Sequence, residues 1–186
     1  MKGWQTDKAW SDKYLPNIKR ILGEHLIGAA PLEEDQERNT DLIVLRMDAV
    51  RIGCRIRRET YAKRYGNEFT IRIARPSGMK TELAKIIEGW GDYFFYGFAC
   101  NSADYLIGWL LGDLKVFRLW FMRKMSDDGG NYPGIKQKNK DGSSDFLAFN
   151  VNDMPKGFLV ARMPPRSSME VPQLTPEVAN SEECLF

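Results

Sequence analysis

Residues 51–75, RIGCRIRRETYAKRYGNEFTIRIAR, are the stretch on which our interpretation of the fold depends. Both ends of this stretch alternate between apolar and polar side chains, which is typical of β-strands with one buried face. The polar face of the first strand carries Arg51, Gly53, Arg55 and Arg57, and that of the second carries Glu68, Thr70 and Arg72. If the two strands pair in register, the arginines of both lie together on one face of a sheet.

Around this stretch the sequence predicts an α/β fold in which a mixed central sheet is flanked by helices. The links between the three strands before residue 76 are short, which predicts an antiparallel meander, and the next helix predicts a crossover. Residues 126–144 are expected to form a polar loop. The expected helices cover residues 11–28, 79–88 and 114–125, and the other strands cover 41–46, 92–100, 105–111, 145–151 and 158–162.

The composition is that of one globular domain. At 186 residues, with 43% hydrophobic and 28% charged residues, the chain is long enough to bury a core of its own. We place this domain at residues 1–163 and expect a disordered tail at 164–186, where Pro, Ser, Glu and Thr dominate. No apolar leader segment and no membrane-spanning apolar run are present, so we expect a cytoplasmic protein without a membrane partner.

The cysteine and histidine content excludes several kinds of site. The three cysteines are widely spaced and form no CxxC pair, which argues against a disulfide framework and a zinc knuckle. Cys54 and Cys100 lie in strand-like apolar runs, so we expect both thiols to be buried. His25 is the only histidine, which excludes two-histidine zinc motifs and weakens any Ser-His-Asp arrangement.

The basic residues allow two interpretations. The net charge of +2 is too small to indicate nucleic-acid binding, so only local clustering is informative. One interpretation is a solvated sheet face on which Glu59 and Glu68 balance the arginines. The other is an anion site for a nucleic-acid backbone, because guanidinium groups bind phosphate through paired hydrogen bonds, and Tyr61 and Tyr65 lie nearby. The nucleic-acid-binding candidates are Arg51, Arg55, Arg57, Lys63, Arg64 and Arg72. We expect Trp90, Trp109 and Trp120 to be core residues rather than base-stacking platforms.

Two carboxylates are candidates for the same face. Asp41 begins the strand that precedes the arginine strand, and Glu24 lies on the first helix, about 60° around the axis from Ile21. Two acids that converge at a sheet edge could hold one Mg²⁺, which prefers oxygen ligands, activates water and stabilises a phosphoryl transition state. A glutamate at the edge of a helix is more often simply solvated, so spacing alone leaves both interpretations open.

In its element order the chain resembles the PD-(D/E)XK nucleases over about residues 10–117. The helix with Glu24, the strand opening with Asp41 and the hairpin from that strand into residues 51–58 are similar to that core. The helix segment TELAK at 81–85 and the aromatic strand YFFYGF at 93–98 follow as they do in the family. The resemblance implies a restriction-endonuclease-like core in which Glu24 and Asp41 are associated with Mg²⁺.

The third motif of that family departs from the pattern here. Arg55-Ile56-Arg57 stands where the family has an acid, any residue and a lysine. Arg57 could replace the lysine as a cation at the transition state, whereas Arg55 cannot replace an acid as a metal ligand. Glu82 or Lys85 on the following helix could supply a migrated group. The catalytic candidates implied by the resemblance are Glu24, Asp41, Arg57 and Lys85.

Three functions therefore remain open. The first is a Mg²⁺-dependent endonuclease acting on DNA, either as a monomer or as a homodimer. The second is a catalytically inactive accessory protein of a phage or mobile element, which binds nucleic acid or blocks a host enzyme. The third is a protein-interaction module that uses the acidic segment 33–37 and the tail. Metal-dependent cleavage, salt-dependent binding without cleavage, and no nucleic-acid affinity distinguish them.

Overall fold

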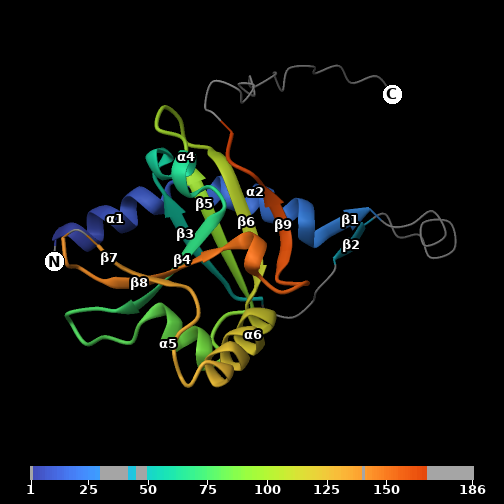
Figure 1. The fold of residues 1–186 in the computed structure, drawn as a ribbon. Coiled ribbons are helices and arrows are strands. Elements are labelled where there is room, and N and C mark those ends of the chain that lie inside the picture. The colour runs from blue at the N-terminus through green and yellow to red at the C-terminus, as the bar shows by residue number, and fades with distance from the viewer. Residues whose placement is uncertain (1, 30–41, 45–49, 140, 167–186) are drawn as a thin grey trace, which may run out of the picture.

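The structure is a computed structural model that describes residues 2–29, 42–44, 50–139 and 141–166, of which 2–5, 24–29 and 42–44 are described by their backbone alone. This part of the chain is a mixed α/β fold with a four-stranded sheet, a three-stranded sheet and helices packed around them, as Figure 1 shows. The α/β class predicted from the sequence is confirmed.

The four-stranded sheet has the order β3-β5-β6-β9. β3 runs parallel to β5, and the remaining neighbours are antiparallel. Parallel neighbours need a long crossover, and here residues 58–92 provide it. The strands are β3 (Ile52–Arg57), β5 (Tyr93–Ala99), β6 (Leu106–Asp113) and β9 (Leu159–Met163). β3 is therefore an edge strand of this sheet.

The three-stranded sheet is antiparallel and has the order β4-β8-β7. Its strands are β4 (Glu68–Ala74), β8 (Asp145–Asn150) and β7 (Ile135–Lys138). A separate two-stranded ribbon pairs β1 (Ile27–Ala29) with β2 (Leu42–Val44). In Figure 1 this ribbon projects beyond the end of α2, on the side of the molecule away from α1.

The helices are α1 (Lys2–Asp12), α2 (Leu15–Leu26), α4 (Ala62–Tyr65), α5 (Glu82–Ile87) and α6 (Leu114–Asp127), with 3-10 turns η1 (Glu59–Tyr61) and η2 (Val151–Asp153). Side-chain caps fix two of the helix starts. Thr81 accepts a hydrogen bond from the Ala84 backbone at α5, and Asp113 accepts two from the first turn of α6. Such caps satisfy backbone N–H groups that have no partner within the helix.

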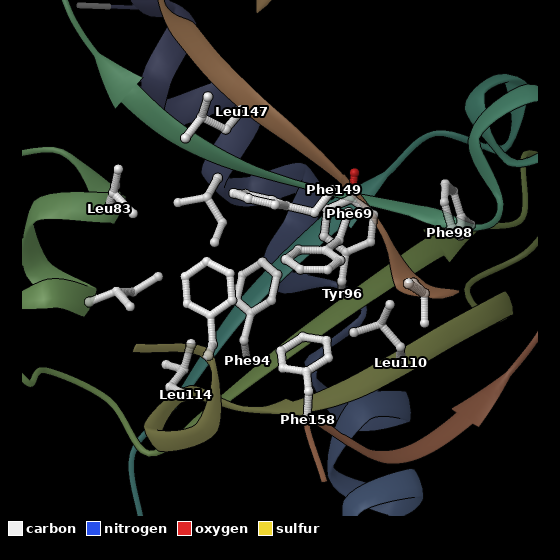
Figure 2. Packing of buried hydrophobic residues seen from close by; sticks show 14 of the residues in the cluster. Phe69, Leu83, Phe94, Tyr96, Phe98, Leu110, Leu114, Leu147, Phe149 and Phe158 are labelled. Atoms are coloured by element: carbon white, nitrogen blue, oxygen red, sulfur yellow. The ribbon is translucent and has the colours of Figure 1, made fainter. Parts of the chain in front are cut away.

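Two hydrophobic clusters lie on the two faces of the four-stranded sheet. The larger one fills the space between the two sheets, α5 and α6, and Phe69 is its centre (Figure 2). The Phe69 ring is fully buried, and its centroid lies 5.2 Å from those of both Phe149 and Phe158. The smaller cluster joins the opposite sheet face to α2 through residues such as Ile18 and Phe95.

The predicted antiparallel meander is wrong. β2 pairs with β1, β3 pairs with β5, and β4 pairs with β8, so the three early strands belong to three different sheets. Direct pairing of β3 with β4 would set Arg55 and Arg57 beside Arg72, and like charges on paired strands destabilise a sheet. The buried aromatic strand β5 instead requires a neighbour on each side, and β3 and β6 provide them.

Several smaller expectations also change. The predicted helix over 11–28 corresponds to α2 at 15–26, while residues 11–12 are the end of α1 and residues 27–28 belong to β1. The predicted loop 126–144 contains β7. Cys100 is buried as expected, whereas the expectation for Cys54 is wrong because the edge position of β3 leaves it exposed.

The predicted boundary at residue 164 falls where the described chain is still in contact with the sheet. The Arg166 backbone N–H donates to the Ile107 carbonyl oxygen at 3.0 Å, so this end of the described chain lies beside β6. Residues 167–186, most of the predicted tail, lie outside the described part of the chain. Among the described helices, none has the length and apolar character needed to cross a membrane.

Candidate functional site

A basic groove of about 840 Å³ lies along the free edge of β3, bordered by α1, β4 and α5. Among the residues that the structure describes, eight cationic side chains and only two acidic ones, Asp7 and Glu82, line this groove. The cationic set is Lys8, Arg51, Arg55, Arg57, Arg58, Arg72, Arg75 and Lys85. Since the whole chain carries a net charge of only +2, positive charge is concentrated here.

The pairing of β3 with β5 explains why its arginines face the groove. Arg55 lies beside Tyr96 and Arg57 beside Phe98, and neighbouring residues of a sheet share a face. Tyr96 and Phe98 belong to the large hydrophobic cluster. The face that is apolar on β5 therefore becomes basic on β3, and the edge of the core is the floor of the groove.

Glu82 ties three elements together at this edge. Its Oε2 accepts hydrogen bonds from Arg55 Nη1 at 2.7 Å and from the Arg72 backbone N–H at 3.0 Å. Arg55 Nη1 also donates to the Thr70 carbonyl oxygen at 3.1 Å. One carboxylate thus joins α5 to β3 and β4, and Arg55 is held in place by the protein itself.

The other arginines of the groove floor have unmet hydrogen-bonding capacity. The Nε atoms of Arg72 and Arg75 are buried and have no hydrogen-bond partner among the described residues. Burial lowers the pKa of Arg72, and the neighbouring charges of Arg55 and Arg75 lower it further, while Glu82 opposes them. Like charges held this close together repel one another, and a bound anion would relieve that repulsion, so the site is suited to an anion.

Two arginines at the end of β3 stack on aromatic rings. The Arg57 guanidinium lies 4.3 Å from the Tyr61 ring centroid, and that of Arg58 lies 5.3 Å from the Trp10 ring centroid. These cation–π contacts hold flexible cations in defined positions at the groove. Planar guanidinium groups and rings are therefore presented beside the cationic floor.

The predicted nucleic-acid-binding residues divide into two groups. Arg51, Arg55, Arg57 and Arg72 line the groove, and so does the catalytic candidate Lys85. Lys63 and Arg64 lie on the short helix α4 and are not among the lining residues; the Arg64 guanidinium instead lies over the Tyr65 ring. Arg72 arrives from the second sheet rather than from a strand paired with β3.

Sequence reasoning missed the contribution of α1 and the exposure of one tryptophan. Lys8 and Trp10 of α1 line the groove, although no segment before residue 11 was expected to be helical. Trp109 and Trp120 pack against the two clusters as predicted, but the same prediction for Trp90 is wrong, because 64% of its surface is exposed and it borders the groove.

The Mg²⁺ site expected at the carboxylates of Glu24 and Asp41 stays a prediction. The backbone of Glu24 lies in α2, its side chain is outside the description, and Asp41 lies outside the described residues. The strand after Asp41, β2, pairs with β1 and not with β3, so the predicted hairpin beside the arginine strand is wrong. Within the described part of the chain no group of three or more His, Cys, Asp or Glu residues could hold a metal ion.

Comparison with known proteins identifies no relative of this chain. No family model, no characterised protein and no solved structure matches the chain. The site must therefore be interpreted from its own geometry.

Proposed function

We propose that this protein binds nucleic acid in the basic groove, with the phosphate backbone paired to arginines of β3 and β4. The observation that carries the proposal is the gathering of eight cationic side chains and only two acidic ones along one groove, among the residues that the structure describes. Phosphate oxygens are suitable partners, because they accept charge-assisted hydrogen bonds from arginine in a paired geometry.

The length of the groove favours a polymer over a single phosphate group. Its lining residues include every position of β3, whose six residues extend over roughly 17 Å. One phosphate could neutralise only some of the cations along that length. A chain of phosphates would meet cations along all of it, and the release of counterions would drive the binding.

Cleavage is the finer form of the proposal. The resemblance to PD-(D/E)XK nucleases supports it through the order of helix, strands and helix and through the acids Glu24 and Asp41. The pairing of β3 with β5 in place of a hairpin from β2 speaks against it. We therefore propose binding as the function, and a nicking assay on supercoiled DNA with Mg²⁺ or Mn²⁺ tests the endonuclease.

A salt titration of binding tests the proposed function. Fluorescence anisotropy with a labelled oligonucleotide is expected to show binding at low salt, with log K falling linearly as log salt rises. Arg57→Gln combined with Lys85→Gln removes two groove cations and should reduce that slope by about 1.5, if each cation neutralises one phosphate.

The matched control carries the same change of charge elsewhere. Arg123→Gln combined with Lys124→Gln alters two exposed cations of α6 that do not line the groove, and it should leave both affinity and slope unchanged. Equal losses in both double variants would show that binding follows net charge and not the groove. Lack of binding to any oligonucleotide at low salt would overturn the proposal.

A further inference from the structure

We infer that the groove takes single-stranded nucleic acid, with unpaired bases stacked on Trp90 and Tyr61. This inference rests on the proposed function and names the form of nucleic acid that the same groove selects. Both rings border the groove, and both are exposed, Trp90 over 64% and Tyr61 over 40% of its surface. A large aromatic ring left exposed inside a cationic groove provides a surface for a planar partner.

The two rings lie at opposite ends of β3. Trp90 is close to the start of the strand, because the Asp92 backbone N–H donates to the Arg51 carbonyl oxygen at 2.8 Å and the Asp92 carboxylate accepts from the Arg51 N–H at 2.8 Å. Tyr61 follows the end of the strand, and Arg57 stacks on one face of its ring, so a base would stack on the face opposite Arg57. The cations of the groove floor therefore lie between two aromatic ends.

The position of Trp90 is fixed by its backbone. Gly89 and Gly91 on either side have φ angles of +93° and +85°, which side chains other than glycine rarely tolerate. The Trp90 N–H donates to the Lys85 carbonyl oxygen at 3.0 Å, so the turn is anchored to the end of α5. An anchored turn presents the exposed ring at low entropic cost on binding.

The length of β3, which separates the two rings, sets the length of nucleic-acid strand that fits the groove. β3 covers roughly 17 Å, which corresponds to about five nucleotides of a stacked strand at 3.4 Å each. Arginines two residues apart on one face of a β-strand lie about 6.7 Å from each other, which is close to the length of two nucleotide steps. A site of this size is within the range of single-strand binding modules.

Double-stranded nucleic acid does not match these features. In a duplex both faces of each base are covered by neighbouring base pairs, so an exposed ring gains no stacking partner. The small cavity beside the groove, lined by Arg57, Tyr61, Tyr65 and Tyr96, holds only about 70 Å³. That volume accommodates a few water molecules and not a flipped base.

The experiment compares one strand with its duplex. Anisotropy with a labelled 12-nucleotide DNA of mixed sequence, alone and annealed to its complement, is measured at the same salt concentration. The single strand is expected to bind at least tenfold tighter than the duplex. Trp90→Leu should weaken single-strand binding by about 5- to 140-fold, the range for loss of one base–ring stack, and should leave duplex binding unchanged.

Three variants separate stacking from other effects. Trp90→Phe restores an aromatic face and should recover most of the affinity, while Leu119→Ala, an exposed apolar position of α6 outside the groove, should change nothing. Tyr61→Leu should also weaken single-strand binding. The difference in tryptophan fluorescence between the wild type and Trp90→Phe reports on Trp90 itself and should show quenching by the single strand only.

The outcomes distinguish the inference from the function on which it rests. Equal or tighter binding of the duplex, with no effect of Trp90→Leu, would overturn the single-strand inference and leave groove binding intact. Failure of Trp90→Phe to recover affinity would exclude stacking as the cause of the loss. Absence of binding to both forms would overturn the proposed function as well.

Discussion

At the scale of single residues, Glu82 allows an additional arginine to lie at the groove, because its carboxylate pairs with that arginine within the protein. Its carboxylate is the acceptor for both Arg55 and the Arg72 backbone, in a place where only 16% of the Arg55 side chain and 28% of the Glu82 side chain are exposed. Without it, Arg55 would join Arg72 and Arg75 as an uncompensated positive charge. Arg57, in contrast, is held at the groove by stacking on the Tyr61 ring.

We therefore expect Glu82→Gln to lower the free energy of unfolding by about 2 kcal/mol, because removal of one partner leaves a half-buried charge unpaired. Urea denaturation measures the change. Glu88→Gln on the following turn is the matched control: Glu88 pairs with Lys80 at 2.6 Å where both side chains are well exposed, so its loss should cost less than about 1 kcal/mol. Equal costs for the two variants would contradict the role assigned to Glu82.

At the scale of elements, the packing of the core depends on close approaches between neighbouring segments. Gly112 of β6 marks one of them, since a Cβ atom there would lie 2.5 Å from the ring of Phe158, which directly precedes β9. Phe158 is fully buried and stacks on Phe69, so it has no room to withdraw. The absence of a side chain at Gly112 lets the segment before β9 cover the core.

Gly112→Ala should accordingly destabilise the fold by about 1–3 kcal/mol, the usual cost of overpacking a filled core. Gly23→Ala provides the opposite case. Gly23 lies inside α2, and nothing lies within 4 Å of the added Cβ, so alanine should stabilise by about 0.5–1 kcal/mol. Thermal unfolding of both variants checks the pair, and a neutral Gly112→Ala would contradict the close packing of β6 against Phe158.

The elements also show what sequence patterns can predict. β3, β4 and the aromatic strand β5 were predicted within a residue or two, because alternation and continuous apolar runs show which faces are buried. Their partners were not predicted, because a buried face does not show which strand lies beside it. α1 was missed because only Trp4, Ala9 and Trp10 are apolar among its residues, and β7 because its four residues are mostly polar and exposed.

The residues of the candidate site show the same contrast between what the sequence pattern could predict and what it could not. Arg55 and Arg57 were assigned to one face from their spacing, which depends only on the geometry of their own strand. Arg72 was assigned to them through a strand pairing that does not exist, yet it reaches the groove from the second sheet. Lys63 and Arg64, close in sequence, are displaced by the turn of α4. Sequence distance was a poor guide wherever a helix or turn intervened.

At the scale of the whole molecule, the groove is a concentration of charge in a nearly neutral protein. Eight cations and two acids line it among the described residues, while the chain as a whole carries a net charge of +2. The rest of the molecule must therefore be close to neutral or acidic. Such asymmetry steers a polyanion toward one edge of the molecule and raises its rate of association at low salt.

The same asymmetry should make the ligand-free protein less stable than its contacts alone would allow, because the groove cations repel one another. The double variant Arg57→Gln and Lys85→Gln, which is expected to weaken binding, is therefore also expected to raise the Tm of the free protein by about 1–3 °C at low salt. The increase should shrink at 0.3 M NaCl, since salt screens repulsion between partly exposed charges. Differential scanning fluorimetry at the two salt concentrations measures this, with Arg123→Gln and Lys124→Gln as the control that should show no increase. A double groove variant that is less stable at low salt would mean that local contacts of these two side chains, such as the stack of Arg57 on Tyr61, outweigh the repulsion among the groove cations, and the predicted instability of the ligand-free groove would be wrong.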